Sequence, residues 1–205
     1  VEINTDPTTG LLFNTVLASR DLGAGPKGIV TNPTGQRAFV ATDAGEIQVW
    51  DIQLGSANYN EQVGAMPSPA GTSPVGPMAI TPAGDRLLSV TDTGDLAFYD
   101  LDAETLLTHP SVGADPRGGV GDPVGERAYV THDNGEVTVV NVEGNPFVVQ
   151  DVATGGSLRG LVVTPAASYI YATDRELDNL KIIEKSGDIE ALANKTELTG
   201  PLAFN

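Results

Sequence analysis

Residues 116–142 read PRGGVGDPVGERAYVTHDNGEVTVVNV and contain three short runs rich in apolar and β-branched residues. Gly, Pro, Asp and Asn separate these runs, first at 121–125 and again at 132–135. Short apolar runs joined by turn-forming residues are typical of antiparallel strands connected by hairpins. The stretch therefore predicts a unit of strand, turn, strand, turn and strand.

The same pattern occurs in three other stretches, Pro26–Ile52, Pro77–Leu101 and Leu158–Glu184. The four unit starts lie 51, 39 and 42 residues apart along the chain. A period of about forty residues built from strands predicts the blades of a β-propeller. A helical repeat is excluded because no segment keeps a 3.6-residue apolar periodicity.

Each blade of a propeller also needs a fourth strand. Phe147–Val152 and Ile189–Ala193 are clear candidates, and Leu106–Val112 is a weaker one. Ser56–Gly76 is longer and rich in Pro, Gly and Ser, which predicts an insertion around the fourth strand of the first unit.

The second strands read AFVAT, LLSVT, AYVTH and YIYAT, and the third strands read IQVWDI, LAFYDL, VTVVNV and LKIIEK. These residues resemble the YVTN-type propeller repeat of surface-layer and lactonase-like propellers. The resemblance covers nearly the whole chain and implies an all-β propeller with four full four-stranded blades. It implies little about activity, because propellers of this kind carry unrelated functions. The last unit departs most, since Ala166–Ser168 replaces the usual Gly turn and Glu184 replaces an Asp or Asn.

The two ends of the chain are predicted to contribute to a further, split or incomplete blade. Residues 1–18 resemble a third and a fourth strand, and TGPLAFN at Thr199–Asn205 matches the start of a blade. Within a single propeller domain of residues 1–205, the expected blades are 26–76, 77–115, 116–157 and 158–200, with a partial blade from 1–25 and 201–205. An incomplete blade would leave strand edges unpaired. Three arrangements would pair them: closure of the chain as a five-bladed ring, membership of a larger propeller, or strand exchange between copies.

The composition narrows the classes of partner. A formal net charge of −16 opposes binding to nucleic acid or to anionic membranes over a broad surface. No apolar run approaches the ~18 residues of a membrane helix, so membrane insertion is not expected. The chain has no Cys, which excludes disulfides and thiolate chemistry. An acidic, Lys-poor chain fits an extracytoplasmic or extracellular location, at the cell surface.

Basic residues recur just after the residue that opens a first strand, at Lys27, Arg117 and Arg159. First strands line the channel of a propeller, so we expect these side chains to converge at one channel mouth. Such a ring could bind an anion or an acidic segment, because guanidinium groups pair with carboxylates and phosphates. The alternative is that each cation pairs with a neighbouring acid.

Acidic residues recur at the corner between the second and third strands, at Asp43, Asp92, Asp133 and Asp174. Asp caps such corners by accepting hydrogen bonds from backbone N–H groups, which predicts a structural role. Asp174, Glu176 and Asp178 are the best candidates for a metal site, and calcium is the only cofactor considered. Their spacing is not that of an EF-hand loop.

Two further sets of recurring residues predict structural contacts. Arg37, Arg86 and Arg127 begin the second strands, and we expect them to bridge to an acid on the next blade. Trp50 and Tyr99 occupy matching positions on third strands and are expected to pack between blades.

No catalytic constellation accompanies the repeats, and the only histidines, His109 and His132, are not expected to share a site. The sequence thus favours a non-catalytic binding or scaffolding propeller in an extracellular or cell-surface assembly. Its partner would be another protein or a second copy, bound through the terminal half-blades. The alternative is a propeller enzyme of the lactonase or quinoprotein-dehydrogenase type, acting on a small anionic substrate at the channel mouth.

Overall fold

A computed structural model describes residues 19–122 and 124–185 of the 205-residue chain, and its regular elements in these ranges are all β-strands. The strands form four antiparallel sheets, each built from strands that are consecutive in the chain. This arrangement confirms the predicted all-β propeller. The partial blade of the chain ends and the fourth strand predicted at Ile189–Ala193 lie outside the described residues.

The four sheets correspond to the four sequence units and are named blades 1 to 4. Blade 1 contains β1 (Pro26–Thr31), β2 (Arg37–Thr42), β3 (Glu46–Asp51) and β4 (Gln62–Pro67). Blade 2 contains β5 (Pro74–Ile80), β6 (Arg86–Thr91), β7 (Leu96–Asp100) and β8 (Thr105–Thr108). Blade 3 contains β9 (Pro116–Gly121), β10 (Arg127–His132), β11 (Glu136–Asn141) and β12 (Phe147–Ala153). Blade 4 contains β13 (Leu158–Val163), β14 (Tyr169–Asp174) and β15 (Asn179–Glu184).

Two strand boundaries differ from the sequence prediction. Strand β5 begins at Pro74 rather than at Pro77, and its pairing with β6 shifts register between Pro74 and Met78. Strand β8 is shorter than the predicted run, and beyond it Ser111 makes only an isolated bridge to Asp95. Pro110 lacks the backbone N–H that a ladder needs, which explains why β8 ends early.

The turn between the first two strands of a blade requires a residue with positive φ. Gly35, Gly84 and Gly125 supply it in blades 1 to 3, with φ of 68°, 76° and 86°. In blade 4 the same place is taken by Ala167, with φ of 54°. The missing Gly noted in the sequence therefore changes the residue but not the conformation of the turn, which Ala adopts at a cost of about 1 kcal/mol or more.

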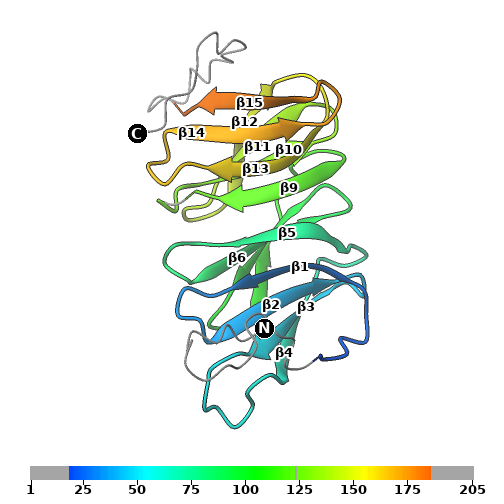
Figure 1. Ribbon diagram of the computed structural model, residues 1–205, viewed down its shortest axis with the longest axis vertical. Coiled ribbons are helices and arrows are strands. Elements are labelled where there is room, and N and C mark those ends of the chain that lie inside the picture. Colours follow the sequence, from blue (N-terminus) through cyan, green and yellow to red (C-terminus); the bar gives the residue numbers. More distant parts are fainter. Residues whose placement is uncertain (1–18, 123, 186–205) are drawn as a thin grey trace, which may run out of the picture.

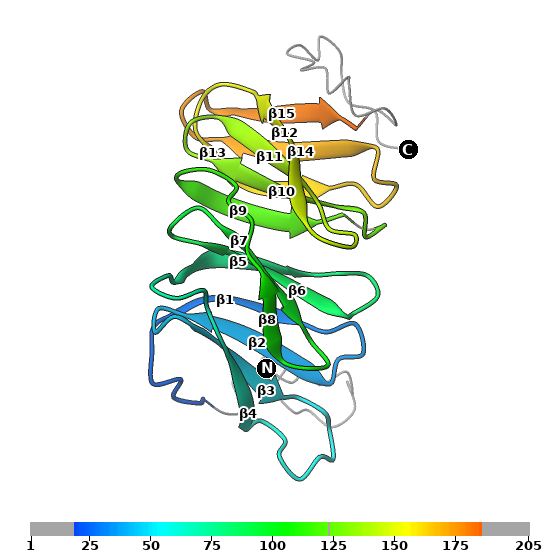
Figure 2. The same cartoon turned by 180° about the vertical axis from the view of Figure 1, so that it is seen from behind.

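Neighbouring blades lie against each other in chain order. The first strands β1, β5, β9 and β13 are neighbours, and Figure 1 shows the blades following one another along the long axis of the molecule. The view from behind shows β4 and β8 on the far side from these first strands (Figure 2).

The hydrophobic core consists of three clusters, one at each junction between blades. Phe39, Ile47 and Val49 of blade 1 meet Leu87 and Tyr99 of blade 2. A second cluster joins blades 2 and 3 around Phe98, Val130 and Val140, and a third joins blades 3 and 4 around Tyr129, Ile170 and Ile183. Because side chains alternate along a strand, each blade buries one face against each neighbour.

The strand-opening arginines do not make the contact that the sequence suggested. Arg37 pairs with Asp51 of its own blade at 3.1 Å, and Arg127 donates to Asn141 of its own blade at 2.7 Å. Arg86 does cross to the next blade, but its acceptor is the backbone carbonyl of Val142 at 2.7 Å. The expected bridge to an acid on the next blade is therefore wrong for these three side chains. Asp51 lies opposite Arg37 and Asn141 lies opposite Arg127 on the third strands, so these two arginines have a partner within their own blade.

Within the part of the chain that the structure describes, there is no helix long and apolar enough to cross a lipid bilayer.

The account of the core predicts a large penalty for truncation between blades. Replacing Phe98, which is fully buried at the junction of blades 2 and 3, with Ala should lower the free energy of unfolding by about 3–5 kcal/mol. Leu107→Ala on the half-exposed strand β8 is the control and should cost less than about 1 kcal/mol. Urea unfolding followed by circular dichroism measures both, and equal effects would contradict a core located between blades.

Candidate functional site

The structure brings two of the three predicted channel cations together. Arg117 on β9 donates from Nε to Oδ2 of Asp133 at 2.6 Å, and its Nη2 pairs with the same oxygen. Arg159 on β13 pairs through Nη1 with Oδ1 of Asp133 at 2.8 Å. Ser157 Oγ donates to the same Oδ1 at 2.8 Å. Asp133 therefore joins blades 3 and 4 through side chains of both.

Lys27 does not belong to this cluster. It lies on β1, two blades away from Arg117, and lines a groove on blade 1. The three cations thus do not all meet one carboxylate, and an anion site that uses all of them stays a prediction.

Asp133 is the exception among the four corner acids. Oδ1 of Asp43 accepts a hydrogen bond from Gly25 N at 2.8 Å, Asp92 accepts one from Ser73 N at 2.9 Å, and Asp174 accepts one from Ser157 N at 3.1 Å. Asp174 also accepts from Glu176 N and Leu177 N at its own corner, which confirms the predicted capping role for this residue. Asp43 and Asp92 cap the loop that leads into the first strand of their blade, whereas Asp133 binds two guanidinium groups instead.

The arginines change the acidity of Asp133. The hydrogen bond from Arg117 is the main reason that the pKa of this carboxyl is lowered, and Ser157 and the charge of Arg159 act in the same direction, against partial burial. One carboxylate neutralises one of the two guanidinium charges, so the cluster keeps one net positive charge.

The proposed calcium ligands do not converge. Burial alone would raise the pKa of Asp174, but hydrogen bonds from the backbone N–H groups of Ser157, Leu177 and Glu176 outweigh it and lower this pKa. Lys181 completes the surroundings of Asp174, with Nζ at 3.4 Å from Oδ2. Over residues 19–122 and 124–185, no three His, Cys, Asp or Glu side chains are grouped as a metal site requires. Calcium binding by Asp174, Glu176 and Asp178 therefore rests on the sequence alone.

The two histidines lie in different surroundings. His132 is buried, with Nδ1 at 2.9 Å from Ala114 O and Nε2 at 3.0 Å from Thr138 Oγ1. His109 is half exposed beside Asp95, with 3.5 Å between Nδ1 and Oδ2. Hydrogen bonds to a backbone carbonyl and a threonine give His132 a structural role at the corner of blade 3.

A buried ion pair makes a second polar connection between blades 3 and 4. Lys185, at the end of blade 4, places Nζ at 2.5 Å from Oδ2 of Asp122, whose side chain is fully buried. Burial and the nearby charge of Asp122 raise the pKa of Tyr129 in the same interface. The last described residue of the chain is therefore held on the side of blade 4 that faces blade 3.

The repeat shows which faces of the terminal blades have no neighbour among the described residues. On the third strands, Tyr99, Val140 and Ile183 occupy one repeat position, face the preceding blade and are fully buried. Trp50 occupies this position in blade 1, where no described blade precedes it. The expected packing between blades is therefore confirmed for Tyr99, whereas for Trp50 it stays a prediction, because no described blade lies on its side of blade 1.

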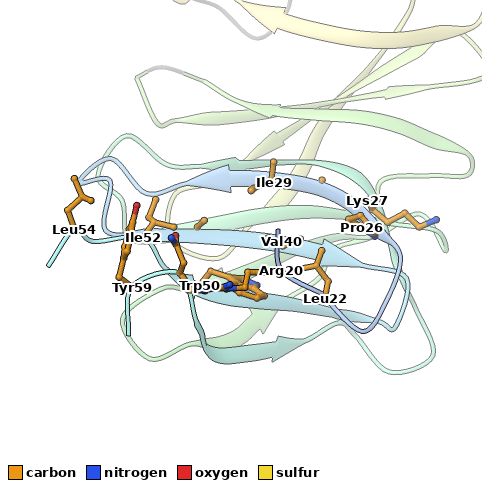
Figure 3. A pocket seen from close by; sticks show the side chains of 13 residues that line it. Arg20, Leu22, Pro26, Lys27, Ile29, Val40, Trp50, Ile52, Leu54 and Tyr59 are labelled. Carbon is orange, nitrogen blue, oxygen red and sulfur yellow. The ribbon is translucent and has the colours of Figure 1, made fainter. Parts of the chain in front are cut away.

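A groove of about 790 Å³ marks this outer face of blade 1. Its lining includes Arg20, Lys27, Ile29, Val40 and Trp50, as Figure 3 shows. Ile29 is 69% exposed there, although its counterpart Met78 packs into the junction of blades 1 and 2. The groove is therefore a blade-packing surface without a described blade on it.

On blade 4, the face without a described neighbour is the one that packs against the following blade at the other junctions. Because Ile170, Ala172 and Ile183 point into blade 3, strand alternation turns Tyr171, Leu180 and Ile182 outward. Leu180 is 53% exposed and Val162 on β13 is 60% exposed. Their counterparts in blades 1 to 3 are turned toward the following blade, and Ile47, Leu96 and Val137 are buried there.

Several solved structures resemble this chain, and two of them, a hydrazine synthase and a candidate 6-phosphogluconolactonase, are propeller folds. Hydrazine synthase from Kuenenia stuttgartiensis matches with a TM-score of 0.69 and 18% identity, over 84% of this chain and 49% of that one. A functionally unknown protein from Desulfotomaculum acetoxidans matches with a TM-score of 0.74 and 18% identity, over 91% and 60%. A candidate 6-phosphogluconolactonase from Bacteroides uniformis matches with a TM-score of 0.73 and 16% identity, over 83% and 53%.

No protein-family model and no curated protein matches the chain. The chain spans about half the length of the solved structures that it resembles. At these identities the likeness concerns the fold alone, and it agrees with the four antiparallel sheets described above. The chain is thus a β-propeller fold.

The Asp133 cluster predicts a pH-dependent contribution to stability. The folded-state pKa of Asp133 lies below its unfolded value of about 3.9, so the stabilisation is present above that pH and is lost as the pH falls through the folded-state pKa. Asp133→Asn should therefore lower the free energy of unfolding by about 1–2 kcal/mol near neutral pH, and by less in acid.

Asp102→Asn, at an exposed turn of blade 2, is the matched control and should change little at either pH. Urea unfolding at neutral pH and near pH 3 measures both variants. A penalty for Asp133→Asn that is the same at both pH values would contradict the role of the charge.

Proposed function

We propose that this chain is a non-catalytic binding or scaffolding propeller of the YVTN-repeat type, which works in an extracellular or cell-surface assembly. The observation that carries the proposal is the outer face of blade 4. Val162, Leu177 and Leu180 are all more than half exposed there, and Tyr169 adds an aromatic ring. Several large apolar side chains exposed on one face mark a surface that another polypeptide covers.

The repeat indicates what such a polypeptide must present. In the three internal junctions, a face of this kind packs on apolar side chains at the positions of Tyr99, Val140 and Ile183. The partner surface should therefore be apolar and sheet-like, with well-packed side chains rather than a deep pocket. A second copy of the chain is the simplest partner, because its own blade 4 exposes an apolar sheet face of the same kind.

The negative charge of the chain restricts which partner groups can bind at the rim of this surface. Glu176 and Asp178 flank Leu177 on the exposed turn between β14 and β15, and the whole chain carries a net charge of −16. Contacts at the rim are therefore favoured with neutral or basic groups, and salt should affect the rate of association more than the affinity.

Self-association predicts a mass above that of the 21.2 kDa monomer. Light scattering coupled to size exclusion should show the mass of the full chain rising with protein concentration. A double variant, Val162→Asp with Leu180→Asp, should return it to monomer because charges at an apolar contact lose their hydration without a partner.

Leu107→Asp, at a half-exposed position on β8, is the matched control and should leave association unchanged. A stable monomer at every concentration, for the wild-type chain and the double variant alike, would contradict this function.

A second candidate function rests on the Asp133 cluster. Its one net positive charge lies between Arg117 and Arg159, and one of the similar structures is described as a candidate 6-phosphogluconolactonase. A propeller enzyme acting on a small anionic substrate would use such a cluster to hold that anion. It would also need a general acid or base nearby, and His132 is already bound to Ala114 O and Thr138.

Two assays separate this candidate from the binding function. Titration with inorganic phosphate, followed by the thermal midpoint, should show tighter binding to Asp133→Asn than to wild type if the cluster binds anions. Hydrolysis of a phosphorylated sugar lactone should not exceed the buffer rate if the chain is not an enzyme. If the chain hydrolyses the lactone and the double variant Arg117→Ala with Arg159→Ala does not, the chain is an enzyme that uses the Asp133 cluster.

A further inference from the structure

The groove on the outer face of blade 1 differs from the face of blade 4 in what lies beside it. The chain that leads into β1 runs along this groove, and Arg20 and Leu22 are part of its lining. Figure 3 shows both side chains on the same side of the sheet as Trp50. A segment of the chain therefore already occupies part of the surface on which a preceding blade would pack.

Hydrogen bonds hold this leading segment in place. Gln48 Nε2 on β3 donates to the carbonyl oxygen of Leu22 at 2.8 Å. Arg20 donates from Nε to Asn60 O at 3.0 Å, and its Nη2 lies 3.4 Å from Glu61 Oε1. The contacts with Asn60 and Glu61 place Arg20 beside the residues that precede β4, at the outer end of the sheet. Arg20 is thus held at the edge of the groove.

The internal junctions show what occupies the corresponding place elsewhere. The stretch before each first strand comes from the fourth strand of the preceding blade. Met66 on β4 and Val152 on β12 are buried in the clusters that join their blades to the next one. Relative to β1, the apolar run LLFNTVL at residues 11–17 stands at a comparable sequence distance.

The charges of the groove and of this segment are complementary. The groove lining includes two cations, Arg20 and Lys27, and none of its residues is acidic, although the chain as a whole has 27 acidic residues and 11 basic ones. Residues 1–18 contain Glu2 and Asp6 and no Lys or Arg. Opposite charges and matching apolar character both favour contact between the two.

We propose that residues 1–18 fold back onto the outer face of blade 1, and that apolar side chains of residues 11–17 cover Trp50. The segment then takes the role that strands of the preceding blade take at the other junctions. The outer face of blade 1 is thereby covered by its own chain. This inference stands independently of any partner bound by blade 4.

Trp50 is the only tryptophan of the chain, so its fluorescence reports on the groove directly. In the 205-residue chain, Trp50 emission should be blue-shifted and only weakly quenched by acrylamide, and neither property should depend on protein concentration. A double variant, Leu12→Asp with Phe13→Asp, should shift emission to the red and increase quenching several-fold. Thr8→Asp with Thr9→Asp is the matched control, with the same added charge in the same segment, and should leave the fluorescence unchanged.

Each other outcome overturns the proposal in a different way. Strong quenching in the wild-type protein would mean that the groove is open. Protection that increases with protein concentration would mean that a second copy covers it. If Trp50 stays protected from acrylamide in the variant Leu12→Asp with Phe13→Asp, some other polypeptide segment covers the groove. The urea midpoint of the double variant shows whether its blades remain folded. If the variant does not fold, quenching of the wild-type protein and its concentration dependence still test the proposal.

Association through blade 4 is read from the mass and not from Trp50, so the two proposals can fail separately. Val162→Asp with Leu180→Asp should change the mass and leave Trp50 protected. Leu12→Asp with Phe13→Asp should expose Trp50 while the wild-type protein still associates.

Discussion

Face-to-face packing of neighbouring blades is the interaction on which the rest of the structure depends. A single small antiparallel sheet is not stable alone, because each of its apolar faces needs a second sheet to exclude water. The three buried clusters meet this need at the three internal junctions. Polar contacts, such as Asp133 with Arg117 and Arg159, then hold blades 3 and 4 in one relative orientation. The same requirement leaves the outer faces of blades 1 and 4 as the two blade-packing faces without a neighbouring blade among the described residues.

The sequence predicted the repeat well because its signals are local. Turn residues and the alternation of apolar positions depend on a few neighbours, so the described strands of the four units were located, with the largest shifts at β5 and β8. Even the Ala-containing turn of blade 4 was recognised as a departure, and Ala167 takes the left-handed conformation of the glycines it replaces.

The contacts of individual side chains could not be predicted in the same way. A repeat pattern shows that Trp50 and Tyr99 face the same way, but not that a described blade lies against only one of them. The pattern also placed Arg117 and Arg159 at one end of the channel without showing that a corner acid would bind both. Asp133 accepts from side chains of Arg117 and Ser157, where the other corner acids accept from backbone N–H groups. This difference depends on how blades 3 and 4 meet in three dimensions, and a local sequence pattern does not contain that information.

The outer faces of blades 1 and 4 therefore differ in character. The face of blade 1 is basic, grooved and crossed by residues 20–22 of its own chain, whereas blade 4 exposes Val162 and Leu180 and holds Lys185 on its other side. A capped end and an open end would give association a direction and limit its extent. Heterologous contact between two uncapped ends would instead form rings or open filaments.

Hydrogen–deuterium exchange read by mass spectrometry tests this difference most directly. Amides of β2 and β3 should exchange as slowly as those of blades 2 and 3 at every protein concentration, because the face of blade 1 is covered by its own chain. Amides of β14 and β15 should exchange faster in dilute protein and slow down as the concentration rises. Equal exchange at the two ends, unaffected by concentration, would contradict the account.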